Sequence, residues 1–266
     1  MASLFLEKAS RIPWDPKTIL LDPDLRGKLL RAPAQIAALA LVETDFSLLI
    51  DKVLCPTWLL WGEEDETAPR RIANILLWRL PAAELRLLPG MGHSPMRDDS
   101  TEFLTALQKC LTELPTPAKK TNPKGRLSDK TVLNQQNATI TGSYNTLGIR
   151  NCQNLKLRNV WAHQIEILDS QIRMEGITVV APAGKTGISV TRSTIVLTGA
   201  DITGSVGIRT NQSRLDLAGL RYHGDGSPIL GTGKPSSLLL STATAYTHGQ
   251  TRSLQGDRGL RSGESI

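Results

Sequence analysis

The sequence predicts a chain of two parts, an α/β unit followed by an all-β solenoid. Residues 56–114 carry short apolar runs and helical patterns in the order strand, helix, strand, helix. Residues 115–130 are rich in proline, lysine and polar groups, a composition typical of interdomain linkers. From Ala138 onwards, an apolar triplet of fixed internal spacing returns at intervals of 17 to 23 residues, without a helical pattern.

The first part should contain two strands of one parallel sheet. Pro56–Trp61 is an apolar run with turn residues on both sides, and Ala83–Leu88 alternates apolar and charged residues. The helical pattern between them stops at Pro81. Asp65 then lies on the loop after the first strand, and His93 on the loop after the second. A right-handed crossover brings such loops to the same edge, so we expect this carboxylate and this imidazole to meet.

The strings W-G-E-E-D-x-x-x-P and G-M-G-H-S-P carry Asp65 and His93, 28 residues apart. Together they resemble the C-terminal part of the α/β-hydrolase superfamily, over roughly residues 20–113. The resemblance implies that Asp65 is the catalytic acid and His93 the catalytic base, acting on a small ester or other acyl compound. It also implies that the helical pieces within Asp24–Glu43 are a remnant of the family's cap, although an ordinary packing helix fits them equally well.

The nucleophile of that family is missing. A G-x-S-x-G string should precede Asp65, but residues 1–64 contain none, and Gly187–Thr191 lacks the last glycine and follows the acid. Without a serine, the Asp and His have nothing to act on. We therefore expect an incomplete serine hydrolase, inactive as this chain alone, as in a truncated or fused gene product. Its nucleophile would come from a missing N-terminal region or a partner chain.

After His93, Asp99 and Glu102 form a capping box for a helix over Ser100–Leu114. Its buried stripe is predicted to contain Phe103, Leu107, Cys110, Leu111 and Leu114. A parallel sheet of two strands leaves an edge open. We expect a partner chain, self-association or the second half of this chain to cover it.

The second part repeats the triplet in six copies, which predicts the stacked coils of a β-solenoid. The four clear copies are Leu155, Leu157 and Val160; Ile172, Met174 and Ile177; Ile195, Leu197 and Ala200; and Leu215, Leu217 and Leu220. Weaker copies are Ala138, Ile140 and Ser143, and Leu238, Leu240 and Ala243. The pattern resembles the right-handed parallel β-helix of pectate-lyase-like proteins. A β-sandwich of short strands is the alternative, and it explains the recurrence less well.

The predicted fold class is thus α/β plus all-β, in four segments. Residues 1–114 form the partial hydrolase-like region, 115–130 the linker, 131–248 the β-helix and 249–266 a flexible tail. The carboxylates Asp169, Asp201, Asp216 and Asp225 fall at different coil positions, so they predict turns and solvation rather than a polysaccharide-cleaving site. His223 is the best single candidate for a site on the β-helix, although an exposed turn is the simpler interpretation.

Composition narrows the function classes. The net charge is +6, but the positive residues are scattered except between Lys119 and Lys130, which favours a solvated linker over a nucleic-acid site. Three irregularly spaced cysteines predict neither disulfides nor a zinc site, and we expect no metal or cofactor. No apolar stretch predicts a membrane span or a secretory signal, so a cytoplasmic location is expected. The alternative to an incomplete hydrolase is a noncatalytic carbohydrate-binding or scaffold protein.

Overall fold

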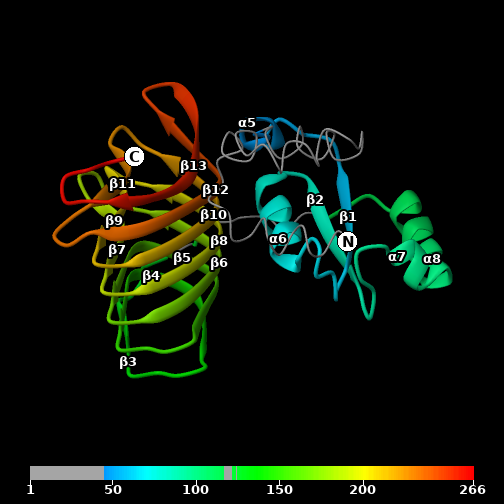
Figure 1. Cartoon of the computed structure of the whole chain (residues 1–266), viewed down its shortest axis with the longest axis horizontal. Coiled ribbons are helices and arrows are strands. Elements are labelled where there is room, and N and C mark those ends of the chain that lie inside the picture. The colour runs from blue at the N-terminus through cyan, green and yellow to red at the C-terminus, as the bar shows by residue number, and fades with distance from the viewer. Residues whose placement is uncertain (1–44, 117–121, 124) are drawn as a thin grey trace, which may run out of the picture.

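The computed structural model describes residues 45–116, 122–123 and 125–266 (Figure 1). The expected cap helices of Asp24–Glu43 lie outside these residues. The described chain is rich in strands, with a small α/β unit at one end of the sequence and a parallel β-solenoid of about six turns after it. None of its helices has the length and apolar content that crossing a bilayer requires.

The α/β unit follows the predicted order of elements. It consists of α5 (Ser47–Ile50), β1 (Thr57–Gly62), α6 (Arg70–Arg79), β2 (Ala83–Leu88), α7 (Pro95–Asp98) and α8 (Ser100–Thr112). β1 and β2 are parallel and in register from the pair Thr57–Ala83 to the pair Gly62–Leu88. Helix α6 ends before Pro81 as expected, because proline cannot continue the hydrogen-bond ladder.

The two-stranded sheet lies between helices. Figure 1 shows α6 between the sheet and the solenoid, and α7 and α8 on the far side of the sheet. Leu88, Met91 and Ala106 form a small buried cluster between the sheet and α8. Within the described residues β1 and β2 pair only with each other. The solenoid therefore covers the outer face of α6, and no other described strand pairs with the edges of the sheet.

Helix α8 begins at the predicted residue, but fewer of its apolar side chains are buried than the sequence predicts. The Asp99 carboxylate accepts hydrogen bonds from the backbone N–H groups of Thr101 and Glu102, both at 3.0 Å. The helix ends at Thr112, two residues before the expected end. Leu111 is 78 % exposed and Leu114 80 % exposed, so their expected place in the buried stripe is wrong. The small buried cluster beside the sheet contains Ala106 of this helix but neither leucine.

The solenoid is built from short parallel strands in two columns. The first column contains β6 (Gln171–Val180), β8 (Thr194–Thr203), β10 (Arg214–His223) and β12 (Ser236–Thr247), and the second contains β3 (Lys130–Leu133), β7 (Thr186–Thr191), β9 (Val206–Asn211) and β11 (Ser227–Gly231). The longer strands β4 (Thr139–Arg150) and β5 (Leu155–Leu168) take part in both columns. β3 begins at Lys130, the last residue of the expected linker.

The apolar triplets stack in register, as the repeat predicts. One row of direct strand partners runs through the first members of five copies: Leu155, Ile172, Ile195, Leu215 and Leu238. All five are buried. The first copy departs at its third position, because a register shift between Ile140 and Gly142 pairs Ser143 with Trp161. Ser143 is exposed, so its expected place in the interior is wrong.

The last segment differs from the flexible tail expected at residues 249–266. Gln250–Leu260 form β13, which pairs antiparallel with β12 from Gln250–Thr247 to Leu260–Ser236. An uncovered β12 would present a row of free backbone N–H and C=O groups. The antiparallel strand pairs with them and ends the stack, so residues 250–260 are part of the solenoid.

Candidate functional site

The structure brings Asp65 and His93 together. Asp65 lies on the loop that follows β1, and His93 on the loop that follows β2. Because the two strands are parallel, both loops lie at the same edge of the sheet. The Oδ2 atom of Asp65 is 3.0 Å from Nδ1 of His93. Their catalytic role stays a prediction, since proximity alone does not identify a reaction.

The Asp65 carboxylate is buried and held from several sides. Its Oδ1 atom accepts hydrogen bonds from the backbone N–H groups of Thr67, at 2.9 Å, and Ala68, at 2.8 Å. Burial acts to raise the pKa of Asp65, but the hydrogen bonds from Ala68 and His93, the charge of His93 and the hydrogen bond from Thr67 outweigh it, and the pKa is lowered. Asp65 is therefore an ionised hydrogen-bond acceptor at neutral pH.

That state of Asp65 fixes the orientation of His93. An ionised carboxylate can only accept, so Nδ1 of His93 must carry the proton that lies between the two groups. Nε2 is then the imidazole nitrogen without a hydrogen-bond partner in the described residues. The His93 side chain is 57 % exposed, whereas that of Asp65 is 6 % exposed. The buried Asp65 carboxylate thus fixes the orientation of a His93 imidazole that is exposed to solvent.

The two loops are tied together by their backbones. The N–H groups of Glu63 and Glu64 donate to the carbonyl oxygens of Leu88, at 3.0 Å, and Met91, at 2.9 Å. A Cβ atom at Gly62 would lie 2.1 Å from the carbonyl oxygen of Gly92, so glycine is required where the loops approach. The positions of Asp65 and His93 therefore depend on rigid backbone contacts.

No nucleophile completes the pair within the described residues. His93 makes no hydrogen bond there to a serine or threonine hydroxyl. The string Gly187–Thr191 lies in β7 of the solenoid, where Ser189 pairs with Glu166 and Arg209 of neighbouring coils. The serine of that string is therefore part of a strand and does not form a strand-to-helix elbow.

A second cluster, which the sequence analysis missed, joins α6 to the solenoid. The guanidinium of Arg71 binds both carboxylate oxygens of Asp216, at 2.8 and 2.7 Å, and also bonds to Thr198. The Trp78 ring lies against Gly199, where a Cβ atom would be 2.6 Å from the ring's Cγ atom. Polar and aromatic contacts therefore attach the crossover helix to β8 and β10.

Arg79 is the most deeply buried charge of this cluster. It is 0 % exposed and binds both carboxylate oxygens of Asp51, each at 2.7 Å, and the carbonyl oxygens of Thr242 and Ser47. Burial acts to raise the pKa of Asp51, but hydrogen bonds from Arg79 and Tyr246 lower it overall. The ion pair links the segment before β1 with α6 and β12.

Of the solenoid candidates, Asp201 and His223 lie near one another, whereas Asp169, Asp216 and Asp225 face separate partners, Arg192, Arg71 and His248. Asp169 pairs with Arg192, and Asp201 with Arg221, so both carboxylates serve ion pairs as part of the solenoid surface. The His223 ring stacks on Tyr246 with ring centres 4.6 Å apart, and burial lowers the pKa of His223. No group of three or more metal-binding side chains occurs among the described residues.

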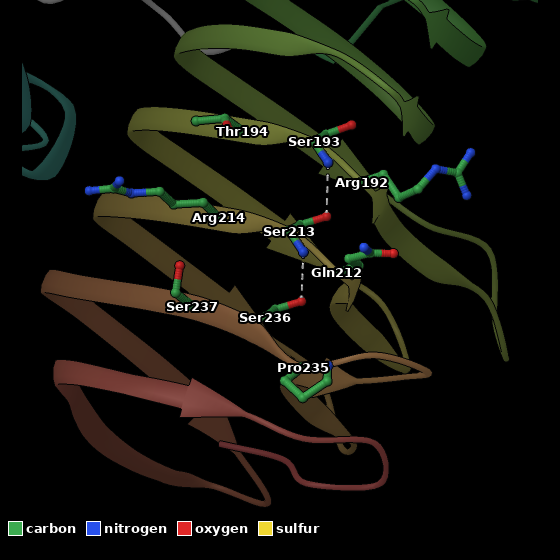
Figure 2. Close-up of a pocket in the computed structure, with 9 residues that line it drawn as sticks. All are labelled: Arg192, Ser193, Thr194, Gln212, Ser213, Arg214, Pro235, Ser236 and Ser237. Carbon is green, nitrogen blue, oxygen red and sulfur yellow. Dashed lines mark hydrogen bonds between the residues drawn. The ribbon is translucent and has the colours of Figure 1, made fainter.

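A groove at one corner of the solenoid, of about 660 Å³, is lined by serines (Figure 2). Figure 2 shows the backbone N–H of Ser193 bonded to the Ser213 hydroxyl, and that of Ser213 bonded to the Ser236 hydroxyl. Ser170 extends this serine ladder, because its hydroxyl accepts from Cys152 and its N–H donates to Ser193. These hydroxyls therefore bind the backbone of the neighbouring coil and are not free to act as nucleophiles.

A second hollow, of about 850 Å³, lies between the first coils and the chain that precedes them. Trp161, His163, Asn145 and Asp129 line it. The Nδ1 atom of His163 bonds to the carbonyl oxygen of Val180 at 2.7 Å. An aromatic ring beside polar side chains suits many small polar ligands. The carbohydrate ligand expected as an alternative stays a prediction.

Comparisons with known proteins do not assign the chain to a family. No family model and no solved structure match it. Three uncharacterized proteins, one of Mycobacterium bovis and two of Mycobacterium tuberculosis, are each 26 % identical to it over 83 residues. The match covers 31 % of this chain and 24 % of each relative, so the chain spans about a quarter of the relatives' length. The hydrolase and pectate-lyase-like resemblances stay predictions.

Proposed function

We propose that the chain is a scaffold protein in which the β-solenoid holds the α/β unit and its Asp65–His93 pair in place. The observation that carries this proposal is the docking of α6, the helix that connects β1 to β2. One side of α6 packs on the two-stranded sheet, and the other meets the solenoid through Arg71, Trp78 and Arg79.

The energetic argument is that the α/β unit has little core of its own. Within residues 45–116, two strands and four helices bury one small apolar cluster, and isolated units of that size are marginal in water. The solenoid, in contrast, has one continuous buried cluster that runs through all its coils. A scaffold role follows because the larger body supplies the stability that the smaller one lacks.

The test is to loosen the interface in the full chain. Trp78→Ala removes the ring that lies on Gly199, and hydrogen exchange is then measured along the whole protein. We expect faster exchange in β1, α6 and β2 and unchanged exchange in the interior strands β8 and β10. Trp58→Ala, which alters an exposed tryptophan contact with Glu113 at the other side of the unit, is the control. Unchanged exchange in β1, α6 and β2 of the Trp78 variant would contradict the proposal.

A second candidate function, acyl hydrolysis, is supported by the 3.0 Å contact between Asp65 and His93 at the carboxyl ends of parallel strands. In this candidate His93 is the general base, Asp65 orients it, and a partner chain or a second copy supplies a serine nucleophile. The open edges of β1 and β2, unpaired within the described residues, are where such a chain would add strands.

A fluorophosphonate probe tests the second candidate, because it labels only activated serines. Labelling is expected for the chain isolated together with its partner, and His93→Ala should abolish it without unfolding the protein. Labelling that persists in the His93 variant would show that another base activates the serine. Light scattering of the purified chain would separate self-association from a requirement for a different partner.

A further inference from the structure

The Asp65–His93 pair has the features of a nucleophile in its own right. We propose that His93 attacks activated aryl esters directly through Nε2 and forms a transient acyl-imidazole, with Asp65 as a positioning residue. This inference does not depend on the scaffold role or on a serine from another chain. It assigns an activity to the described residues as they stand.

The first supporting observation is the 3.0 Å contact between Nδ1 of His93 and the buried carboxylate of Asp65, from which the tautomer follows. The buried, ionised Asp65 accepts the Nδ1 proton of His93, so the lone pair of the neutral ring lies on Nε2. A free imidazole distributes its proton between both nitrogens, whereas His93 is held in the form that leaves Nε2 available. The carboxylate is fixed by Thr67 and Ala68, so the ring keeps its orientation.

The second observation is an exposed ring on a buried carboxylate, a combination that distinguishes His93 from the other three histidines of the sequence. The His93 side chain is 57 % exposed while its carboxylate partner is 6 % exposed. His163 bonds to a backbone carbonyl and His223 stacks on Tyr246. His248 faces Asp225 at 3.8 Å, with both side chains largely exposed, so that pair is neither buried nor well aligned.

The reaction balances with water as the co-reactant. The Nε2 lone pair forms a bond to the ester carbonyl carbon, and the bond from that carbon to the aryloxide oxygen breaks, so the aryloxide leaves with the electron pair. The acyl-imidazolium releases its Nδ1 proton to solvent, where the aryloxide takes up one proton and becomes the phenol. Water then adds to the acyl carbon, the carbon–nitrogen bond breaks, and imidazole and a carboxylic acid are released. In the overall reaction, the aryl ester and water are converted to a carboxylic acid and a phenol.

The expected substrates are small esters with good leaving groups. In the part of the chain that the structure describes, Nε2 has no hydrogen-bond partner, so the proposal assumes no preformed oxyanion donors and requires an ester that is already reactive. Alkyl esters and amides are not expected to react at a measurable rate. The proposed substrate class is therefore aryl esters such as p-nitrophenyl acetate.

The experiment treats the full chain with p-nitrophenyl acetate, stops the reaction rapidly and locates the acetyl group by mass spectrometry of peptides. We expect acetyl on the peptide that contains His93, and release of nitrophenol that falls to the rate of free imidazole or below in His93→Ala. His248→Ala is the matched control and should leave both readouts unchanged. Acetyl that appears only on lysines or on other histidines would overturn the proposal.

Asp65→Asn tests the positioning role, because it keeps an oxygen for the N–H groups of Thr67 and Ala68 but loses the charge. Acylation should slow by about tenfold or more. Nitrogen-15 NMR of the ring gives an independent readout, with a shift from the Nδ1-protonated tautomer to a mixture. An unchanged tautomer and rate would refute the role of Asp65. Absence of fluorophosphonate labelling would not affect the acetylation results expected here, because no serine takes part in this reaction.

Discussion

At one corner of the solenoid, serine side chains form hydrogen bonds with backbone groups that cannot pair between strands. The hydroxyls of Ser170, Ser193 and Ser213 each accept an N–H from the previous coil and donate to the carbonyl two residues before them, as Ser193 does with Ser170 and Thr191. The Ser236 hydroxyl accepts from the N–H of Ser213 and from the hydroxyl of Thr210. Both partners of each of the first three hydroxyls are backbone groups at a turn, where no ladder of strand hydrogen bonds is available. The hydroxyl is the smallest group that can serve both at once.

Ser193→Ala should therefore lower the free energy of unfolding. The substitution leaves the N–H of Ser170 and the carbonyl of Thr191 without their shared partner in a buried corner, at a cost of about 1–3 kcal/mol. Urea denaturation followed by circular dichroism measures it. Ser237→Ala, an exposed serine that lines the same groove, should change stability by less than about 0.5 kcal/mol. Equal effects of the two changes would contradict the ladder's structural role.

The serine ladder could have been predicted from the sequence. Ser170, Ser193, Ser213 and Ser236 each stand two residues before the first member of an apolar triplet, and Cys152 stands one residue further back. The same reasoning that aligned the triplets would have aligned these serines. The first triplet was misplaced at Ser143 for a different reason. A register shift is a local backbone event, and a fixed apolar spacing contains no sign of it.

At the scale of elements, the decisive contact is between helix α6 and a row of glycines at the turns of successive coils. Gly176, Gly199 and Gly219 have positive φ angles and face Trp78 or Ile75 of α6. Glycine serves two purposes there, because it accepts the left-handed turn and leaves room for the helix. The strand order of the α/β unit was predictable from local patterns. This contact was not predictable, because it joins residues between 98 and 144 positions apart.

Gly199→Ala should loosen α6. At φ +72° an alanine is strained, and its Cβ would lie 2.6 Å from the Trp78 ring, so we expect a loss of about 2 kcal/mol or more. Gly259→Ala, where nothing lies within 4 Å of a Cβ, is the control and should be nearly neutral. Unfolding of both variants in urea gives the comparison. A Gly199 variant as stable as the control would mean that α6 does not rest on this corner.

The Asp65–His93 pair shows how far sequence reasoning reaches at the level of the site. The two strand ends were located from apolar runs, and the parallel order placed both loops at one edge. Closeness followed from topology, and the 3.0 Å contact agrees with it. The depth of Asp65 and the exposure of His93 did not follow, because both depend on how the loops pack around Gly62 and Gly92. The proposed nucleophilic imidazole depends on those two properties.

Within the described residues, a network of buried and partly buried charges also links the two parts of the molecule. Asp51 precedes β1, Arg79 ends α6, and Arg221 and Tyr246 belong to β10 and β12, yet all four share one network. Burial raises the cost of leaving any of these charges without a partner. The α/β unit and the solenoid are therefore coupled by electrostatics as well as by the packing of Trp78.

This coupling predicts a loss of docking in acid. The pKa values of Asp51 and Asp65 are lowered in the folded protein, so both groups favour the fold while they are ionised. The two carboxylates contribute their full stabilisation of the fold at pH values above the ordinary aspartate pKa of about 3.9. This stabilisation is lost as the pH falls through their lowered pKa values in the folded protein. Pepsin digestion at successively lower pH should therefore cut residues 45–116 before it cuts the solenoid.

The variant Asp51→Asn distinguishes the loss of this charge network from acid unfolding of the whole protein. The variant leaves the fully buried Arg79 without its anionic partner, so it should be less stable at neutral pH by about 3–5 kcal/mol. Its remaining stability should depend less on pH below about 4, because one of the titrating groups is gone. Asp257→Asn, at an exposed position of β13, serves as the control. If residues 45–116 of the Asp51 variant become protease-sensitive at the same acid pH as in the unaltered chain, the ion pair does not hold the two parts together.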